Sequence, residues 1–154
     1  MKVALLVCYC VMMMIVLTIL YTTIVYCHEK YQQSDPILHE IRENLLLLSP
    51  QVSRLYFYVD KKSYTINKQR IYLCVKDSKD NYYPINMLMY VAIHELAHVL
   101  CDEIGHTPKF HKIFEKLLDQ ATELGIYDPH IPIIQDYCGY KTKESFCQGS
   151  NCEK

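Results

Sequence analysis

Residues 94–98 read HELAH, two histidines and a glutamate at the spacing of the HExxH motif. On an α-helix, residues four apart differ by about 40° in direction and about 6 Å in height, so His94 and His98 project from one face. Imidazoles placed in this way can bind one Zn²⁺ at about 2.0–2.1 Å. Glu95 is next to the first ligand, where its carboxylate can take a proton from a metal-bound water whose pKa falls towards about 7. The motif therefore predicts metal-assisted hydrolysis with Glu95 as the general base.

The motif is expected to lie on a helix that runs from Ile85 to Glu103 after Pro84. This segment has no internal Gly or Pro. One side of it carries side chains at steps of three and four: Met87, Val91, His94, His98 and Cys101. An amphipathic helix with two incidental histidines would give the same short motif. Histidines on an apolar face are costly unless they are paired or bind a metal, so the flanking sequence favours the metal site.

The third ligand is expected from His106, in the turn that follows. Gly105 can adopt the left-handed conformation that often ends a helix. Thr107 is a candidate N-cap, and Pro108 suits the first position of a second helix that continues to Leu124. That helix has an apolar stripe made of Phe110, Ile113, Phe114, Leu117, Leu118, Ala121 and Leu124. Packing of the stripe against the first helix would bring His106 to the metal.

Three other residues near the motif offer alternatives. His111 is a second candidate for the third ligand, but it lies off the apolar stripe and is expected on the solvent-exposed face. Glu103 is a further alternative ligand. Asp102, four residues beyond His98, could orient an imidazole from outside the ligand set. The two carboxylates would equally fit a solvated helix end.

The segment HELAHVLCDEIGHTPKFHKIF resembles the WLM/SprT-like group of zinc metallopeptidases. The shared pattern is HE-L-x-H, a short link, and H-x-x-x-F at the start of another helix. In this chain those positions are His94, Glu95, His98, His106 and Phe110. The stretch from ELGIYDP to DYCGY is similar to membrane-anchored WLM-like proteins of large DNA viruses. The resemblance covers roughly residues 50–140 and implies a peptidase whose zinc is held by the three histidines.

The resemblance also implies an α+β fold of the zincin type, with a short β-sheet packed on the motif helix. Three β-rich runs precede that helix: Arg54–Val59, Tyr64–Ile66 and Ile71–Val75. In peptidases of this kind an edge of the sheet near the zinc pairs with an extended peptide substrate, and we expect strand 71–75 to be that edge. Tyr137 or Tyr140 could donate a hydrogen bond to the developing oxyanion, or either could serve only in packing.

Residues 3–27 form a run of uncharged, mostly apolar residues. As a helix they would extend about 37 Å, enough to cross a hydrocarbon core of about 30 Å. A secretory signal has an apolar region of only about 7–15 residues, although residues 25–27 would pass as a cleavage site. We therefore expect a single-pass membrane protein with a retained signal anchor. Lys2 on one side and Lys30 and Arg42 on the other leave its orientation open.

The charge of the chain is nearly balanced, with 16 Lys and Arg against 17 Asp and Glu. Affinity for nucleic acid comes mainly from basic side chains at phosphates. A row of lysines (Lys109, Lys112 and Lys116) follows one side of the second helix, an arrangement more typical of a solvated face. We therefore expect a peptide or protein substrate, a membrane contact through residues 3–27, and no nucleic-acid partner.

Eight cysteines are present, three of them in the apolar N-terminal run. Cys74 and Cys101 have apolar surroundings and are expected to be buried thiols. Cys138, Cys147 and Cys152 lie in a polar tail, where one bridge is expected.

Four segments are expected along the chain. They are a membrane anchor at 1–27, a juxtamembrane segment at 28–49 with a helical pattern over Pro36–Leu48, a metallopeptidase domain at 50–140, and a Cys-containing polar tail at 141–154.

The leading hypothesis is a membrane-anchored zinc metallopeptidase. A zinc-stabilised interaction module without turnover would use the same three histidines, but such a module has no need of Glu95. A peptidase acting on nucleic-acid-associated proteins would need a basic surface, and the chain offers only the lysine row.

Overall fold

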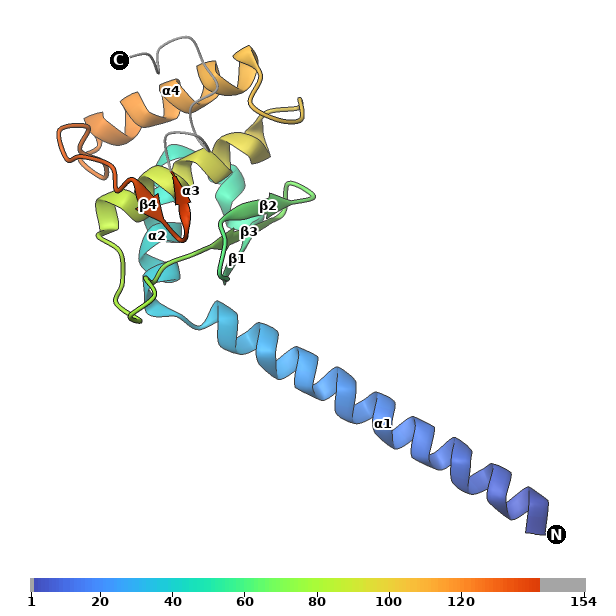
Figure 1. Cartoon of the computed structure of the whole chain (residues 1–154). Coiled ribbons are helices and arrows are strands. Elements are labelled where there is room, and N and C mark those ends of the chain that lie inside the picture. Colours follow the sequence, from blue (N-terminus) through green and yellow to red (C-terminus); the bar gives the residue numbers. More distant parts are fainter. Residues whose placement is uncertain (1, 142–154) are drawn as a thin grey trace. The chain divides into compact units, whose positions relative to one another are not determined.

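The structure, a computed structural model, describes residues 2–141. Contacts within the chain divide it into two units, Met1–Ser34 and Asp35–Lys154. The first unit contains helix α1, and the second contains the other helices and strands of the described residues (Figure 1). The HELAH motif therefore lies in the second unit, with all the elements that surround it.

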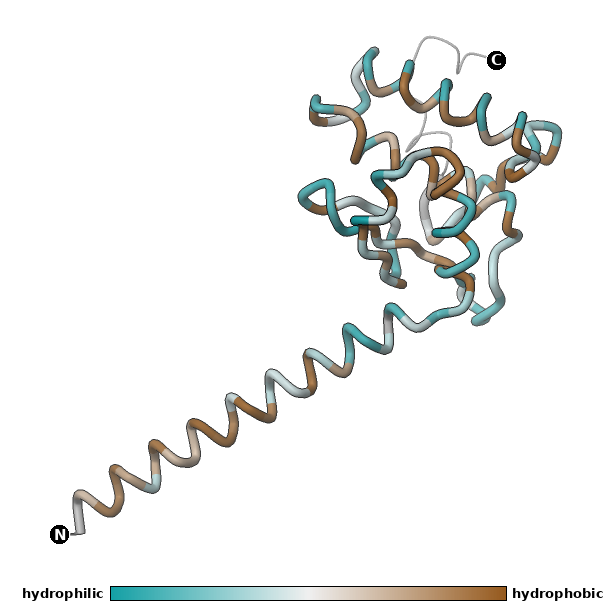
Figure 2. Tube along the Cα trace, turned by 180° about the vertical axis from the view of Figure 1, so that it is seen from behind, coloured by the Kyte–Doolittle hydropathy of each residue, from teal (hydrophilic) through white to brown (hydrophobic). Residues whose placement is uncertain are grey.

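Helix α1 spans Lys2–Gln33, and its stretch Ala4–Tyr31 is long and apolar enough to cross a membrane (Figure 2). An N-terminal signal sequence has the same properties, so the helix fits a retained anchor and a cleaved signal alike. Three hydroxyls within it, those of Thr18, Thr22 and Thr23, donate to carbonyl oxygens three or four residues back. Such bonds would lower the cost of placing these hydroxyl groups in a lipid bilayer.

In the second unit a three-stranded sheet packs on helix α3, and helix α4 packs on the same helix (Figure 1). The strands of the sheet are β1 (Tyr56–Val59), β2 (Tyr64–Ile66) and β3 (Arg70–Leu73). The helices are α2 (Pro36–Leu48), α3 (Ile85–Leu100) and α4 (Pro108–Glu123), with a 3₁₀ turn at Pro50–Arg54. A two-stranded hairpin of β4 (Asp136–Tyr137) and β5 (Tyr140–Lys141) follows α4. The unit is thus α+β, as the sequence predicts.

Helix α2 contributes to the core of this unit. Asp35 caps its start by accepting a hydrogen bond from the Ile37 amide at 3.1 Å, and Pro36 occupies its first turn. Its buried face packs against α3 and β1 through Leu38, Ile41 and Leu45. The predicted helix Pro36–Leu48 is confirmed, and it packs on the helix that carries the motif.

The three predicted strands are present, but their order, β1-β3-β2, places β3 in the middle of the sheet. β1 pairs with β3 in parallel, whereas β2 pairs with it in antiparallel fashion through a tight turn. Asn67 and Lys68 form that turn, with φ of 51° and 53°. The prediction that strand 71–75 is an edge was therefore wrong, because β1 returns to pair with the free side of β3. β2 is an edge strand, and it lies against α3.

The sheet buries one face against the helices. Phe57, Ile71 and Leu73 point to this face and are buried. On the other face Tyr58, Tyr72 and Tyr64 stack in register, with ring centroids 4.9 and 4.6 Å apart. Because side chains alternate along a strand, Thr65 points from β2 towards α3.

Helix α3 ends at Leu100, earlier than the predicted end at Glu103. Cys101 has an extended backbone, with φ −77° and ψ 128°. The Lys68 ammonium donates a hydrogen bond to the Cys101 carbonyl oxygen and so stabilises the end of the helix. This early end releases residues 101–106 as a loop.

Helix α4 begins as predicted. The hydroxyl of Thr107 accepts a hydrogen bond from the Phe110 amide at 3.3 Å, and Pro108 is the first helical residue. Four side chains of the predicted stripe are buried: Phe110, Phe114, Leu117 and Ala121. Leu124, also assigned to the stripe, is 51% exposed, because the helix ends at Glu123 and turns at Gly125 (φ 70°).

A disulfide joins Cys74 to Cys138. Cys74 follows β3, and Cys138 lies in the turn between β4 and β5. The prediction of a buried Cys74 thiol was wrong, since folding brings together two cysteines that are 64 residues apart. Cys101 is a buried free thiol, as predicted. The expected bridge partners Cys147 and Cys152 lie outside the described residues.

Replacing Cys74 and Cys138 together with alanine is expected to lower the free energy of unfolding by about 2–4 kcal/mol, because the bridge restricts a long loop of the unfolded chain. Urea unfolding of the full chain in detergent, with and without dithiothreitol, checks this. The reductant should lower the midpoint of the wild type and leave that of the double variant in place. Equal shifts in both proteins would contradict a stabilising bridge.

Candidate metal centre

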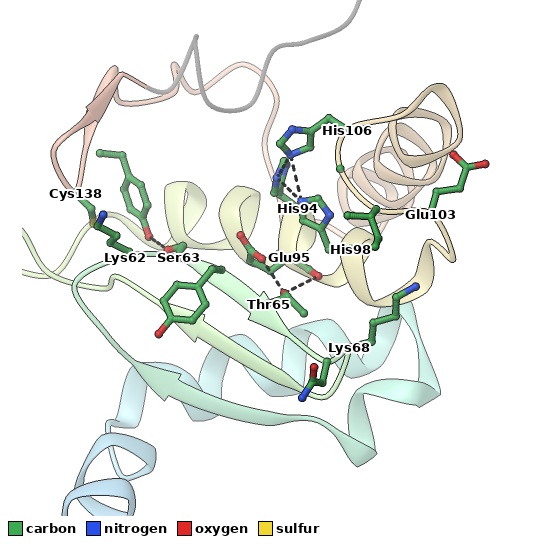
Figure 3. A pocket seen from close by; sticks show the side chains of 15 residues that line it. Lys62, Ser63, Thr65, Lys68, His94, Glu95, His98, Glu103, His106 and Cys138 are labelled. Carbon is green, nitrogen blue, oxygen red and sulfur yellow. Dashed lines mark hydrogen bonds between the residues drawn. The ribbon is translucent and has the colours of Figure 1, made fainter.

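Three histidine side chains converge at the end of α3 (Figure 3). His94 and His98 lie one turn apart on α3, and His106 comes from the loop before α4. Their Nε2 atoms are 3.2 Å (His94 to His98), 3.2 Å (His98 to His106) and 3.0 Å (His106 to His94) apart. The structure thus brings together the three histidines that the sequence singles out, and the group could hold a metal ion.

Hydrogen bonds alone do not explain this convergence. Each Nε2 is either a donor or an acceptor in the plane of its ring, so at least two of three nitrogen atoms share the same role. At least one of the three short contacts is then repulsive. A cation removes the conflict, because all three nitrogen atoms can present a lone pair to it. Nitrogen atoms about 2.0–2.1 Å from one tetrahedral ion lie roughly 3.3–3.4 Å apart, close to the separations found here.

Burial keeps the imidazoles neutral. Desolvation, followed by the charges of neighbouring histidines, lowers the pKa of His94 to about 2. Desolvation and then His106 lower the pKa of His98 to about 4. The pKa of His106 is also lowered, by desolvation and then by His111. Neutral imidazole is the form that binds metal, so the ligands are ready at neutral pH.

The ring of Phe110 packs against all three imidazoles. Its centroid lies 4.3 Å from that of His98, with the rings stacked, and 4.9 Å from those of His94 and His106, with the rings edge to face. Phe110 is fully buried in the first turn of α4. The position of α4 therefore determines how the ligands are oriented.

Glu95 is buried on the side of the histidines that faces the sheet (Figure 3). Thr65 on β2 donates a hydrogen bond from Oγ1 to Glu95 Oε2 at 2.7 Å. Desolvation raises the pKa of Glu95 to about 7, although the bond from Thr65 acts to lower it. A carboxyl group with such a pKa can both accept and release a proton at neutral pH.

Two contacts hold the loop of residues 101–106. Lys68 donates to the Cys101 carbonyl oxygen at its start, and Asp102 pairs with Lys109 of α4 at 2.6 Å. Asp102 is exposed, so its carboxylate secures the loop to α4 instead of orienting an imidazole. Glu103 is exposed at the rim of the cavity and lies outside the group of three ligands.

His111 is half-buried, and the prediction of an exposed position was wrong. Its ring centroid lies 6.2 Å from that of His106, and it does not belong to the ligand group. Its Nε2 is buried and has no hydrogen-bond partner among the described residues. The first turn of α4 packs His111 towards the histidines, although its place off the apolar stripe suggested a solvated face.

A cavity of about 710 Å³ opens onto the histidines. Its walls come from β2 with its flanking residues, from α3, from the loop before α4, and from the turn after β4. Tyr137 in the last wall is buried, donates its hydroxyl proton to the Cys74 carbonyl oxygen and bonds to Ser63 at 3.0 Å. That proton is therefore not available to an oxyanion, and Tyr137 acts in packing. The side chain of Tyr140 lies outside the described part of the structure.

Comparison with known proteins gives viral relatives. The chain is 56% identical over 80 residues to the uncharacterized protein 136R of Invertebrate iridescent virus 6, a match that covers 50% of this chain and 45% of that protein. It is 51% identical over 80 residues to the uncharacterized protein 042R of Invertebrate iridescent virus 3 (51% and 50%). It is 44% identical over 82 residues to the uncharacterized protein R325 of Acanthamoeba polyphaga mimivirus (50% and 41%).

These matches cover about half the length of the relatives or less. No model of a protein family matches the chain. No solved structure matches it either. The relatives are viral proteins that carry no functional description, so the resemblance to WLM/SprT-like peptidases stays a prediction.

Sequence reasoning did not identify two residues that complete the site. Thr65 lies between Tyr64 and Ile66 in a run of only three strand residues, where one inward polar side chain is easily overlooked. Lys68 belongs to a turn, and its contact with Cys101 depends on the tertiary structure. Alternation along β2 could have identified Thr65, whereas no local signal identifies Lys68.

If the three histidines hold a metal, replacing Phe110 with leucine is expected to weaken the affinity for added Zn²⁺ by about tenfold or more, because the ring that orients the imidazoles is lost. Competition with a chromophoric zinc chelator measures the affinity. Phe57→Leu is a matched control, since Phe57 is buried in the sheet. Equal zinc affinity of the two variants would contradict an orienting role for Phe110.

Proposed function

We propose that this chain is a zinc-dependent metallopeptidase of the WLM/SprT-like, zincin type, with its catalytic domain carried by a membrane-spanning α1. One observation supports this more than any other. Three neutral imidazoles converge on one point beside a buried glutamate, and both face the same cavity. A structural zinc site usually fills its fourth position with a protein ligand, whereas catalysis needs that position open.

His94, His98 and His106 would hold the zinc. Bound there, the ion would lower the pKa of a water molecule towards about 7 and polarise the scissile carbonyl group. Glu95 accepts the proton of the attacking water and delivers it to the leaving amine. The raised pKa of its buried carboxyl group suits both transfers at neutral pH.

The peptide substrate is proposed to lie along β2. Within the described sheet, β2 pairs with β3 on one side and with no strand on the other. Tyr64 and Thr65 of this strand line the cavity together with Glu95. Main-chain hydrogen bonds from an edge strand hold an extended peptide with little regard to its sequence. The cavity provides room for side chains at the bond to be cleaved.

An interaction module without turnover is a weaker proposal. A carboxylate buried beside three histidines costs free energy, and a domain that only binds could replace it with an apolar residue. The position of Glu95 in the cavity wall beside the three histidines therefore supports hydrolysis.

The Cys74–Cys138 bridge supports an assignment of the membrane side. Disulfides persist in oxidising compartments and are rare in the cytosol. We therefore propose that the catalytic domain faces the oxidising side of the membrane, with the N-terminal end of α1 on the other.

Replacing Glu95 with glutamine is expected to abolish hydrolysis and preserve zinc binding, because an amide fills the same volume but does not accept the proton. The assay is cleavage of casein by the full chain in detergent, read by mass spectrometry, with zinc content measured on the same samples. Glu115→Gln, on the exposed face of α4, is the control. Undiminished cleavage by the Glu95 variant would contradict the role of Glu95 as the general base.

A further inference from the structure

The hydroxyl of Thr65 contacts Glu95, the proposed general base. Its Oγ1 lies 2.7 Å from Glu95 Oε2 and 3.3 Å from the carbonyl oxygen of the same residue. A hydroxyl has one proton, and the shorter contact with a carboxylate is the stronger bond. The proton of Thr65 is therefore donated to Oε2.

This bond treats the two carboxylate oxygens of Glu95 differently. Oε2 uses a lone pair for Thr65, and Oε1 accepts no hydrogen bond from the described residues. A proton on Oε2 would take charge from the oxygen that accepts from Thr65 and weaken that bond, whereas a proton on Oε1 leaves Oε2 as a carbonyl-like acceptor. The bond also fixes the orientation of the Glu95 carboxylate, which is buried and accepts no other hydrogen bond from the described residues.

We propose that Thr65 is a positioning residue that directs the transferred proton to Oε1 of Glu95. This inference rests on the proposed function. In the first transfer the O–H bond of the attacking water breaks, its electron pair stays on oxygen, and the proton binds Oε1. In the second transfer the Oε1–H bond breaks, its electron pair stays on Oε1, and the proton binds the nitrogen atom of the leaving amine as the C–N bond of the peptide breaks. Thr65 donates to Oε2 throughout, so the carboxylate does not rotate between the two transfers.

The placement of Thr65 explains why the donor comes from the sheet. β2 lies against α3, and alternation points Thr65 towards Glu95 while Tyr64 stacks on Tyr72 of β3. The β-branched side chain has few rotamers, which keeps the hydroxyl in place. The strand proposed to receive the substrate thus also orients the base.

The test compares Thr65→Val with Thr65→Ser in the full chain. Valine has nearly the same shape without the hydroxyl, so kcat should fall about 10- to 150-fold, the range for loss of a hydrogen bond to a charged group. KM and zinc content should stay unchanged, because the substitution keeps the main chain of β2, which is proposed to hold the peptide, and leaves the three histidines intact. Serine restores the donor and should recover most of kcat. Thr122→Val, on the exposed face of α4, is the matched control and should equal the wild type.

A second measurement does not depend on activity. Urea unfolding of the wild type, Thr65→Val, Glu95→Leu and the double variant gives the coupling between the two side chains. Thr65→Val should lower the free energy of unfolding in the wild-type background. It should have little effect in the Glu95→Leu background, where the carboxylate that accepts the hydrogen bond is already gone.

Each adverse result has its own meaning. A kcat of Thr65→Val equal to that of the wild type, or no recovery with serine, would overturn the positioning role. A wild type without hydrolysis but with intact coupling would remove the proposed function and reduce Thr65 to a structural contact. Absence of coupling would overturn the inference even in an active enzyme.

Discussion

The structure depends on how the side chains of His94, Glu95 and His98 are accommodated on α3, a helix that is buried on almost every side. Twelve residues of α3 are buried, among them His94 and Glu95. A polar group in such a place is costly unless it finds a partner. The neighbours supply these partners: the loop brings His106 to the imidazoles, α4 brings Phe110 against them, and β2 brings a hydroxyl to Glu95. The sheet, the loop and α4 therefore each provide a contact to a buried polar side chain of α3.

This constraint explains which features could be predicted. The spacing of His94 and His98 fixes one face of a helix, and Gly105, Thr107 and Pro108 mark the turn that returns the chain to it. Both helices and the convergence of His106 follow from these local signals. The four-residue and three-residue strands were also recognisable as β-rich runs.

Features set by distant pairing could not be predicted. The central position of β3 depends on β1 joining its far side, and the Cys74–Cys138 bridge depends on the turn after β4 reaching the end of β3. His111 is half-buried where the first turn of α4 packs near His106, and the Lys68 ammonium contacts the Cys101 carbonyl oxygen just after the end of α3. The strand order and the disulfide are decided by residues far along the chain, and no local pattern reports them.

We propose that His94, His98 and His106 together bind one metal ion. The zinc content of the purified full chain, wild type beside His106→Ala and His111→Ala, is the measurement to make first. One zinc per chain is expected in the wild type and in His111→Ala, and marked loss of zinc is expected in His106→Ala. A wild type without zinc, or zinc that survives His106→Ala and disappears in His111→Ala, would contradict it.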